Sequence, residues 1–299
     1  MKRLVILCVA AALAAVISSA RSVRLQADGN MAQQLPEPRK QFGAGVTGAF
    51  EGWFTKKDGS RWFLVGYYNR NSRQALDVPV GPDNRIEPGG PDMGQPTHFL
   101  PGRQTGMFVV PVPKTFGPDD RLTWTIVANG QSASIPLRLH PDYVIDPFTE
   151  IAIGNTPPVV RFEEKGAAVQ GPVAQVDAAA TRAASVASPM TLMLWAADDM
   201  KYLSSTGAPV SGSRPPVTIT WSKYRGPGDV AFEKAKPPVD ALSETGKAPF
   251  NGKAITTVTF SEPGDYVLHV TANDYSGDGG GGFVCCWTTA VMKVSVSPR

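Results

Sequence analysis

Short runs of alternating apolar and polar residues cover most of this chain, and each run ends near Gly, Pro, Asn or Asp. Successive side chains of an extended chain point to opposite faces, so this alternation predicts half-buried β-strands. In the first half the runs occupy residues 49–54, 61–68, 75–80, 106–112, 122–128 and 132–139. In the second half they occupy residues 190–197, 217–223, 229–232, 254–260, 266–273 and 283–296. The pattern predicts an all-β protein.

Two dipeptides mark tight turns between neighbouring runs. Asp58-Gly59 and Asn129-Gly130 tolerate the positive φ angles of a hairpin, so we expect a β-hairpin at each. Residues 81–105 are rich in proline and are predicted to form a long ordered loop or a pair of turns. Residues 167–187 are rich in Ala and Val and are predicted to include a short helix.

Alternation in the last strands also assigns the faces that a sandwich would bury. Three sets of side chains each share one face: Val217, Ile219 and Trp221; Tyr266, Leu268, Val270 and Ala272; and Cys286, Thr288, Ala290, Met292, Val294 and Val296. The chain has 30 Gly and 27 Pro among 299 residues, a turn-rich composition that agrees with many short strands. We therefore expect two tandem immunoglobulin-like β-sandwich domains after a cleaved signal peptide.

The expected segments differ in composition. They are a signal peptide at 1–20, a mobile lead-in at 21–44, a first sandwich at 45–148, a linker at 149–155 and a second sandwich at 156–299. Lys2 and Arg3 precede an apolar run that ends at Ser18-Ser19-Ala20, where a signal peptidase would cleave. That run is shorter than the roughly 20 residues of a membrane span. The sequence predicts a secreted or periplasmic bacterial protein without a membrane span after cleavage.

The net charge of the chain does not indicate a particular binding partner. The formal net charge is +3 without a long block of one sign, so nucleic acid is not an expected partner.

Several motifs of the second half occur in a fixed order. They are Asn155-Thr156-Pro157-Pro158-Val159, Ile219-Thr220-Trp221-Ser222, Gly226-Pro227-Gly228, Thr257-Val258-Thr259-Phe260, Pro263-Gly264-Asp265-Tyr266 and Thr271-Ala272-Asn273-Asp274. This order resembles PKD-type immunoglobulin-like domains. The resemblance implies a Trp between two sheets and a tyrosine corner, in which the tyrosine hydroxyl clamps a loop. The first half contains Gly66-Tyr67-Tyr68-Asn69-Arg70-Asn71, Gln95-Pro96-Thr97-His98-Phe99 and Leu122-Thr123-Trp124-Thr125. With these motifs it resembles exported bacterial proteins of unassigned function.

Cys285-Cys286 is an unusual pair, because adjacent residues of a strand point to opposite faces. Three states compete: a vicinal disulfide in an eight-membered ring, two unpaired thiols, and an intermolecular bridge through Cys285. A vicinal ring beside Trp287 would offer a flat patch on which a sugar or another flat ligand could stack.

Acidic residues gather at one expected end of the second sandwich. Asp198 and Asp199 end one strand, while Asp274 and Asp278 lie in a Gly-rich loop after another. Calcium takes six to eight oxygen ligands, so a calcium site is one hypothesis. A hairpin tip with solvated carboxylates is the alternative. No other cofactor is expected.

Aromatic residues are dense in two adjoining strands of the first half. The candidate ligand-binding residues there are Trp62, Tyr67, Tyr68, Asn69 and Arg70. Exposed rings with nearby amides form a platform for carbohydrate or a surface polymer. The alternative is that these rings are core.

Motifs of catalysis are missing from the sequence. There is no Gly-x-Ser-x-Gly, phosphate-binding loop or His-Glu-x-x-His, and the three histidines are far apart in sequence. We therefore expect a non-catalytic structural or recognition protein of the cell envelope or extracellular space that binds carbohydrate or a surface polymer. The alternatives are self-assembly or adhesion to envelope or extracellular proteins, and an accessory role in an extracellular polymer-degrading enzyme.

Overall fold

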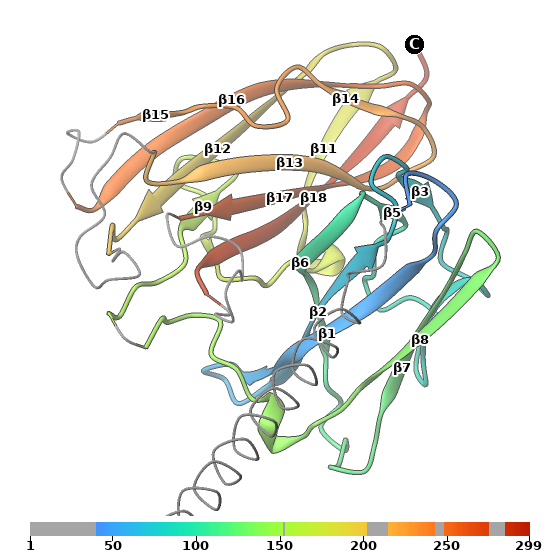
Figure 1. Cartoon of the computed structure of the whole chain (residues 1–299). Coiled ribbons are helices and arrows are strands. Elements are labelled where there is room, and N and C mark those ends of the chain that lie inside the picture. Colours follow the sequence, from blue (N-terminus) through green and yellow to red (C-terminus); the bar gives the residue numbers. More distant parts are fainter. Residues whose placement is uncertain (1–39, 152, 202–214, 243–247, 275–284) are drawn as a thin grey trace, which may run out of the picture. The chain divides into compact units, whose positions relative to one another are not determined.

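The computed structural model describes residues 40–151, 153–201, 215–242, 248–274 and 285–299. The predicted signal peptide and lead-in residues 21–39 lie outside these ranges. Three small sheets make up the first half, in the strand orders β1-β2-β6, β4-β7-β8 and β3-β5 (Figure 1). Their strands are β1 (Val46–Thr55), β2 (Arg61–Asn69), β3 (Leu76–Asp77), β4 (Asn84–Glu87), β5 (His98–Phe99), β6 (Gly102–Pro111), β7 (Leu122–Ala128) and β8 (Gln131–Leu137).

Two larger sheets make up the second half, one in the order β10-β9-β12-β16-β14 with β15 also on β16, the other in the order β11-β18-β17-β13. The first comprises β9 (Val159–Arg161), β10 (Val169–Gln170), β12 (Met190–Asp198), β14 (Val230–Phe232), β15 (Val239–Ala241) and β16 (Phe250–Phe260). The second comprises β11 (Ala180–Ser185), β13 (Thr218–Arg225), β17 (Gly264–Asn273) and β18 (Trp287–Ser297). Two 3-10 turns, η1 (Pro141–Tyr143) and η2 (Val176–Ala178), complete the described elements. The all-β prediction is confirmed.

Both predicted hairpins are present. Strand β1 pairs antiparallel with β2 around Asp58-Gly59, and β7 pairs antiparallel with β8 around Asn129-Gly130. Asn129 and Gly130 have φ angles of 50° and 71°, as the turn requires. The predicted inner faces are also buried, with Val217, Ile219 and Trp221 in the core between the two larger sheets.

Three local predictions are wrong. Residues 81–105 are more than a loop, because they contain β4 and β5. Residues 167–187 form β10, η2 and β11 in place of a helix, since β11 is recruited by parallel pairing with the distant β18. The end of the predicted mobile lead-in is fixed, because the Ala44 amide donates to Asn71 Oδ1 (2.7 Å) and the Asn71 side chain donates back to the Ala44 carbonyl (2.8 Å).

The tyrosine corner expected from the PKD resemblance is formed. The Tyr266 hydroxyl donates to the Glu262 carbonyl (2.8 Å) and accepts from the Gly228 amide (3.0 Å). It therefore ties the loop after β13 to the turn before β17, as the Pro263-Gly264-Asp265-Tyr266 motif predicts.

The sheet that contains β17 and β18 is buried on both faces. Leu268 and Met292 face the core shared with the β12–β16 sheet, whereas their neighbours Val267 and Val291 belong to the core of the first half. Polar contacts join the halves as well. The guanidinium of Arg225 makes a bidentate pair with Asp92 (2.9 and 2.8 Å), which holds the pKa of that carboxyl below its ordinary value.

Residues 40–299 thus form one compact unit with cores that both halves share. The expected domain boundaries at 45–148 and 156–299 stay a prediction. Within the described ranges, none of the helical segments has the length and hydrophobicity of a membrane span.

Candidate binding cleft

A cleft of about 740 Å³ lies between the tip of the β1–β2 hairpin and the chain that enters the second half. One side is formed by Thr55–Asp58 and the other by Ile145–Thr149, with Gln170 of β10 between them. This volume is in the range of small-ligand sites, roughly 300–1,000 Å³.

The wall of the cleft is apolar and aromatic. Phe54 and Phe148 meet edge to face, with ring centroids 5.4 Å apart and an interplanar angle of 80°. Below them lies a cluster with Leu64, Val109 and Trp287 fully or almost fully buried. Trp62 and Ile145 pack against the same cluster, so the wall rests on a rigid apolar base.

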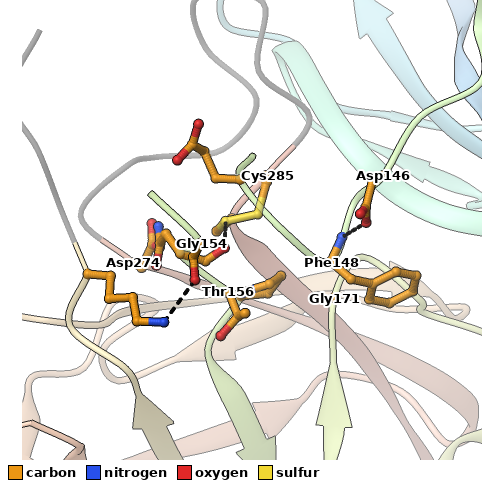
Figure 2. Close-up of a disulfide and its surroundings, with 12 residues drawn as sticks. Asp146, Phe148, Gly154, Thr156, Gly171, Asp274 and Cys285 are labelled. Carbon is orange, nitrogen blue, oxygen red and sulfur yellow. Dashed lines mark hydrogen bonds between the residues drawn. A yellow bond between two sulfur atoms is a disulfide. The ribbon is translucent and has the colours of Figure 1, made fainter. Parts of the chain in front are cut away.

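Local backbone features fix the position of Phe148. Asp146 Oδ1 accepts from the Phe148 amide (2.9 Å), which closes a turn just before the ring (Figure 2). The ring lies against Gly171, where an added Cβ would be 2.6 Å from a Phe148 carbon. Gly171 also has a φ of +85°, so glycine meets both a steric and a conformational requirement here.

Two lysines bring positive charge to the rim. Lys56 Nζ lies 4.3 Å from the centroid of the Trp62 ring, and the Trp62 indole donates to Ser60 Oγ (2.8 Å). Lys57 is exposed at the hairpin tip. Within the described ranges neither lysine forms an ion pair, although the charge of Lys56 adds to the Ser60 hydrogen bonds in lowering the pKa of the nearby Asp58.

The carboxylates of the cleft are engaged locally. Hydrogen bonds from the Ser60 hydroxyl (2.6 Å) and amide (2.9 Å) hold the pKa of Asp58 below its ordinary value. Asp146 accepts from Phe148 as described above. Asp58 is thus an anion at neutral pH and a poor proton donor.

The predicted aromatic platform is only partly at the surface. Tyr67 and Asn69 are fully buried, which excludes them from contact with a ligand at the surface. The Tyr67 hydroxyl accepts from the Leu100 amide (2.8 Å), and burial raises the pKa of the phenol. Asn69 donates to the Gln74 and Phe99 carbonyls. These two residues belong to the core alternative.

The remaining platform candidates differ in position. Tyr68 is half-buried and Arg70 is exposed, but neither lines the cleft. Trp62 alone of the five lies beside it, through its contact with Lys56.

Cys285 and Cys286 are joined by a disulfide in this structure (Figure 2). Both cysteines and Trp287 are buried, so the predicted flat stacking patch is not offered to a ligand. Cys286 Sγ lies 3.5 Å from the Asn155 carbonyl oxygen, and the Trp287 ring packs under the cleft and against Gly106. The indole therefore supports the cleft from below.

The acidic residues lie around the turn at Asn155-Thr156. Asp274, 5% exposed, accepts from the Asn155 side-chain amide (2.7 Å), and Asp199 accepts from the Thr156 amide (3.2 Å) and hydroxyl (3.0 Å). Asp198, 4% exposed, accepts from the Met200 amide (2.8 Å). Figure 2 shows Asp274 and Thr156 close to the disulfide.

The calcium hypothesis stays a prediction. Asp278 lies outside the described residues, and the part of the chain that is described holds no group of three His, Cys, Asp or Glu side chains placed to bind a metal ion.

Sequence reasoning missed Lys56, Lys57 and Phe148. The two lysines lie at a hairpin tip, where charged residues are common. They line the cleft only because the fold places residues 145–149 opposite them. Phe148 ends the expected first domain just before the expected linker, and no periodic signal marks its packing against Phe54.

The fold defines an all-β protein of packed sheets. No family model matches the sequence, and no curated protein matches it. Among solved structures, domains 4 and 5 of the S-layer protein SbsC are 10% identical, with a TM-score of 0.20, 85% of this chain covered and 98% of that one.

Two further solved structures are similar at the same level. A Porphyromonas gingivalis W83 protein of unknown function is 9% identical, with a TM-score of 0.23 and coverage of 84% and 100%. The sialic acid binding region of a Streptococcus sanguinis SK1 adhesin is 12% identical, with a TM-score of 0.19 and coverage of 86% and 78%. Likenesses at this level assign no function to this chain.

Proposed function

We propose that this chain is an exported, non-catalytic recognition module that binds carbohydrate or a cell-surface polymer in the cleft between residues 55–58 and 145–149. The observation that carries the proposal is an aromatic wall beside two lysines that lack ion pairs within the described ranges. Export rests on the signal sequence expected at residues 1–20.

The chemistry of the cleft favours a sugar with an acidic group. The C–H face of a pyranose ring packs on aromatic carbons such as those of Phe148. A carboxylate or sulfate on the same sugar is neutralised by the ammonium groups of Lys56 and Lys57. Gln170 and Thr149 add an amide and a hydroxyl that hydrogen-bond to sugar hydroxyls.

Binding is proposed in place of turnover because of the state of the carboxylates. Hydrolysis of a glycosidic bond needs one carboxyl that donates a proton near neutral pH. The pKa of Asp58 is lowered, which is the opposite of that requirement, and Asp146 is committed to the turn that positions Phe148.

A glycan screen with matched variants tests this function. Wild-type protein is expected to bind acidic oligosaccharides, and the double variant Lys56→Gln/Lys57→Gln should lose about tenfold or more in affinity, or about 1.4 kcal/mol. Trp62→Ala should also weaken binding. Lys114→Gln removes an exposed lysine of the first half that is outside the cleft and serves as the control.

The proposal is wrong if folded wild-type protein binds no glycan in the screen. It is equally wrong if Lys56→Gln/Lys57→Gln binds as tightly as Lys114→Gln.

A further inference from the structure

The outer face of the β10-β9-β12-β16-β14 sheet carries exposed apolar, aromatic and basic side chains. The inner face of β12 is buried through Leu192, Leu194 and Ala196. On the opposite face, Met193 of β12 and Ile255 of β16 are direct cross-strand partners and are 39% and 48% exposed. An exposed pair of large apolar side chains on adjacent strands is a feature of interaction surfaces.

A tryptophan stands in the next row of the same face. Trp195 of β12 pairs with Arg161 of β9 on one side and with Lys253 of β16 on the other. Lys253 Nζ lies 4.7 Å from the centroid of the Trp195 ring. The next outward residue along β12 is the small Ala197, and the indole of Trp195 is half-buried.

Neither cation of this row is neutralised by an ion pair among the described residues, although Lys253 contacts the Trp195 ring. Among the described residues, Arg161 and Lys253 make no ion pair and Arg161 donates no hydrogen bond to a side chain. Asp240 of β15 follows Lys253 in the row but is not within ion-pair distance of it. Two strand spacings separate the backbones of Arg161 and Lys253, or about 10 Å. The row therefore offers an arginine and a lysine on the two sides of a tryptophan, with the Lys253 ammonium in contact with the ring.

We infer that this face is a second binding surface, which takes an extended acidic polysaccharide. Charge complementarity selects the occupant: two acidic groups of one chain bind Arg161 and Lys253, and the sugar between them packs on Trp195. The exposed Met193 and Ile255 widen the apolar part of the surface. This surface uses residues of β9, β12 and β16 and shares none with the cleft, so it goes beyond the proposed function.

Affinity electrophoresis of the full mature chain tests the inference, with hyaluronate as the acidic polymer and dextran as the neutral one. Wild-type protein should be retarded by hyaluronate, with affinity that falls as salt is raised, and should not be retarded by dextran. Trp195→Ala and Arg161→Gln should each lose about tenfold in affinity. Asp240→Asn should bind more tightly, because it removes the carboxylate next to Lys253.

Controls separate this surface from the cleft. Lys165→Gln removes an exposed lysine outside the row and should bind as the wild type does. Lys56→Gln/Lys57→Gln should retain binding to hyaluronate through the sheet face, even if it loses short oligosaccharides. Circular dichroism confirms that each variant is folded.

Three outcomes overturn the inference. The first is no retardation of the wild type by hyaluronate. The second is unchanged binding by folded Trp195→Ala and Arg161→Gln. The third is a wild-type dimer in light scattering that Trp195→Ala converts to a monomer, which would assign the face to a second copy of the chain.

Discussion

His269 gives the folded chain a pH dependence that can be worked out from its surroundings. The imidazole is buried on β17, its ring stacks on Tyr224 with centroids 5.6 Å apart, and its Nε2 donates to the Met107 carbonyl of β6 (3.1 Å). Burial lowers the pKa of His269 from 6.5 to about 4. The neutral imidazole thus bridges the two halves.

The sign and size of the effect follow from proton linkage. Between about pH 4 and pH 6.5 the unfolded chain binds a proton at His269 and the folded chain does not, so stability falls as the pH falls through this window. With these pKa values, the free energy of unfolding drops by about 2 kcal/mol from pH 7 to pH 5 on account of this residue. The pKa values of Asp77 and Asp92 are lowered, so these groups titrate below this window.

Urea unfolding at pH 7 and pH 5 measures the effect. His269→Gln keeps an N–H donor but does not titrate, and it should lose about 2 kcal/mol less between the two pH values than wild type does. His140→Gln changes a histidine with a side chain that is 45% exposed and should behave as the wild type. Equal losses in wild type and His269→Gln, or a pKa near 6.5 for His269 by NMR titration, would refute the reasoning.

Three more predictions concern the base of the cleft and the acidic turn. Gly106→Ala should destabilise the protein by about 2 kcal/mol or more, because the φ of Gly106 is +55° and the new Cβ would lie 2.5 Å from the Trp287 ring. Gly59→Ala is the control: its φ is +81° but no atom lies near the new Cβ, so it should cost about 1 kcal/mol. Equal urea midpoints for the two variants would contradict this prediction. Mass spectra of the peptide that contains Cys285-Cys286 should show two hydrogens fewer than the reduced form, and free alkylation in the folded protein would exclude the disulfide. The calcium hypothesis predicts that calcium raises the melting temperature of wild type and raises that of Asp274→Asn by less, and no shift in wild type would remove the hypothesis.

Local signals in the sequence were sufficient for the strands and turns. Asn129-Gly130 predicts its hairpin because few other dipeptides accept two positive φ angles. Tyr266 predicts its corner because the flanking Pro-Gly-Asp sequence marks a turn before a strand. The burial of Leu268 and Val270 follows from alternation alone.

Long-range pairing accounts for what the sequence did not reveal. Strand β11 exists because β18, more than 100 residues later, pairs with it, and its Ala-rich sequence carries no strong strand signal. Val267 and Val291 are buried against the first half of the chain. The alternating pattern predicted burial of only one face of the β17–β18 sheet, whereas both faces are buried. The cleft is likewise formed by two segments that are about 90 residues apart in sequence, as Lys56 and Asp146 are. No local sequence pattern indicates that such distant segments lie close together in space.

A crystal structure of the protein with the acidic oligosaccharide that binds best tests the central claim most directly. We expect a sugar ring against Phe148, with its acidic group at Lys56 or Lys57. A sugar bound elsewhere on the chain, with the space between residues 55–58 and 145–149 free of it, would contradict the proposed recognition site.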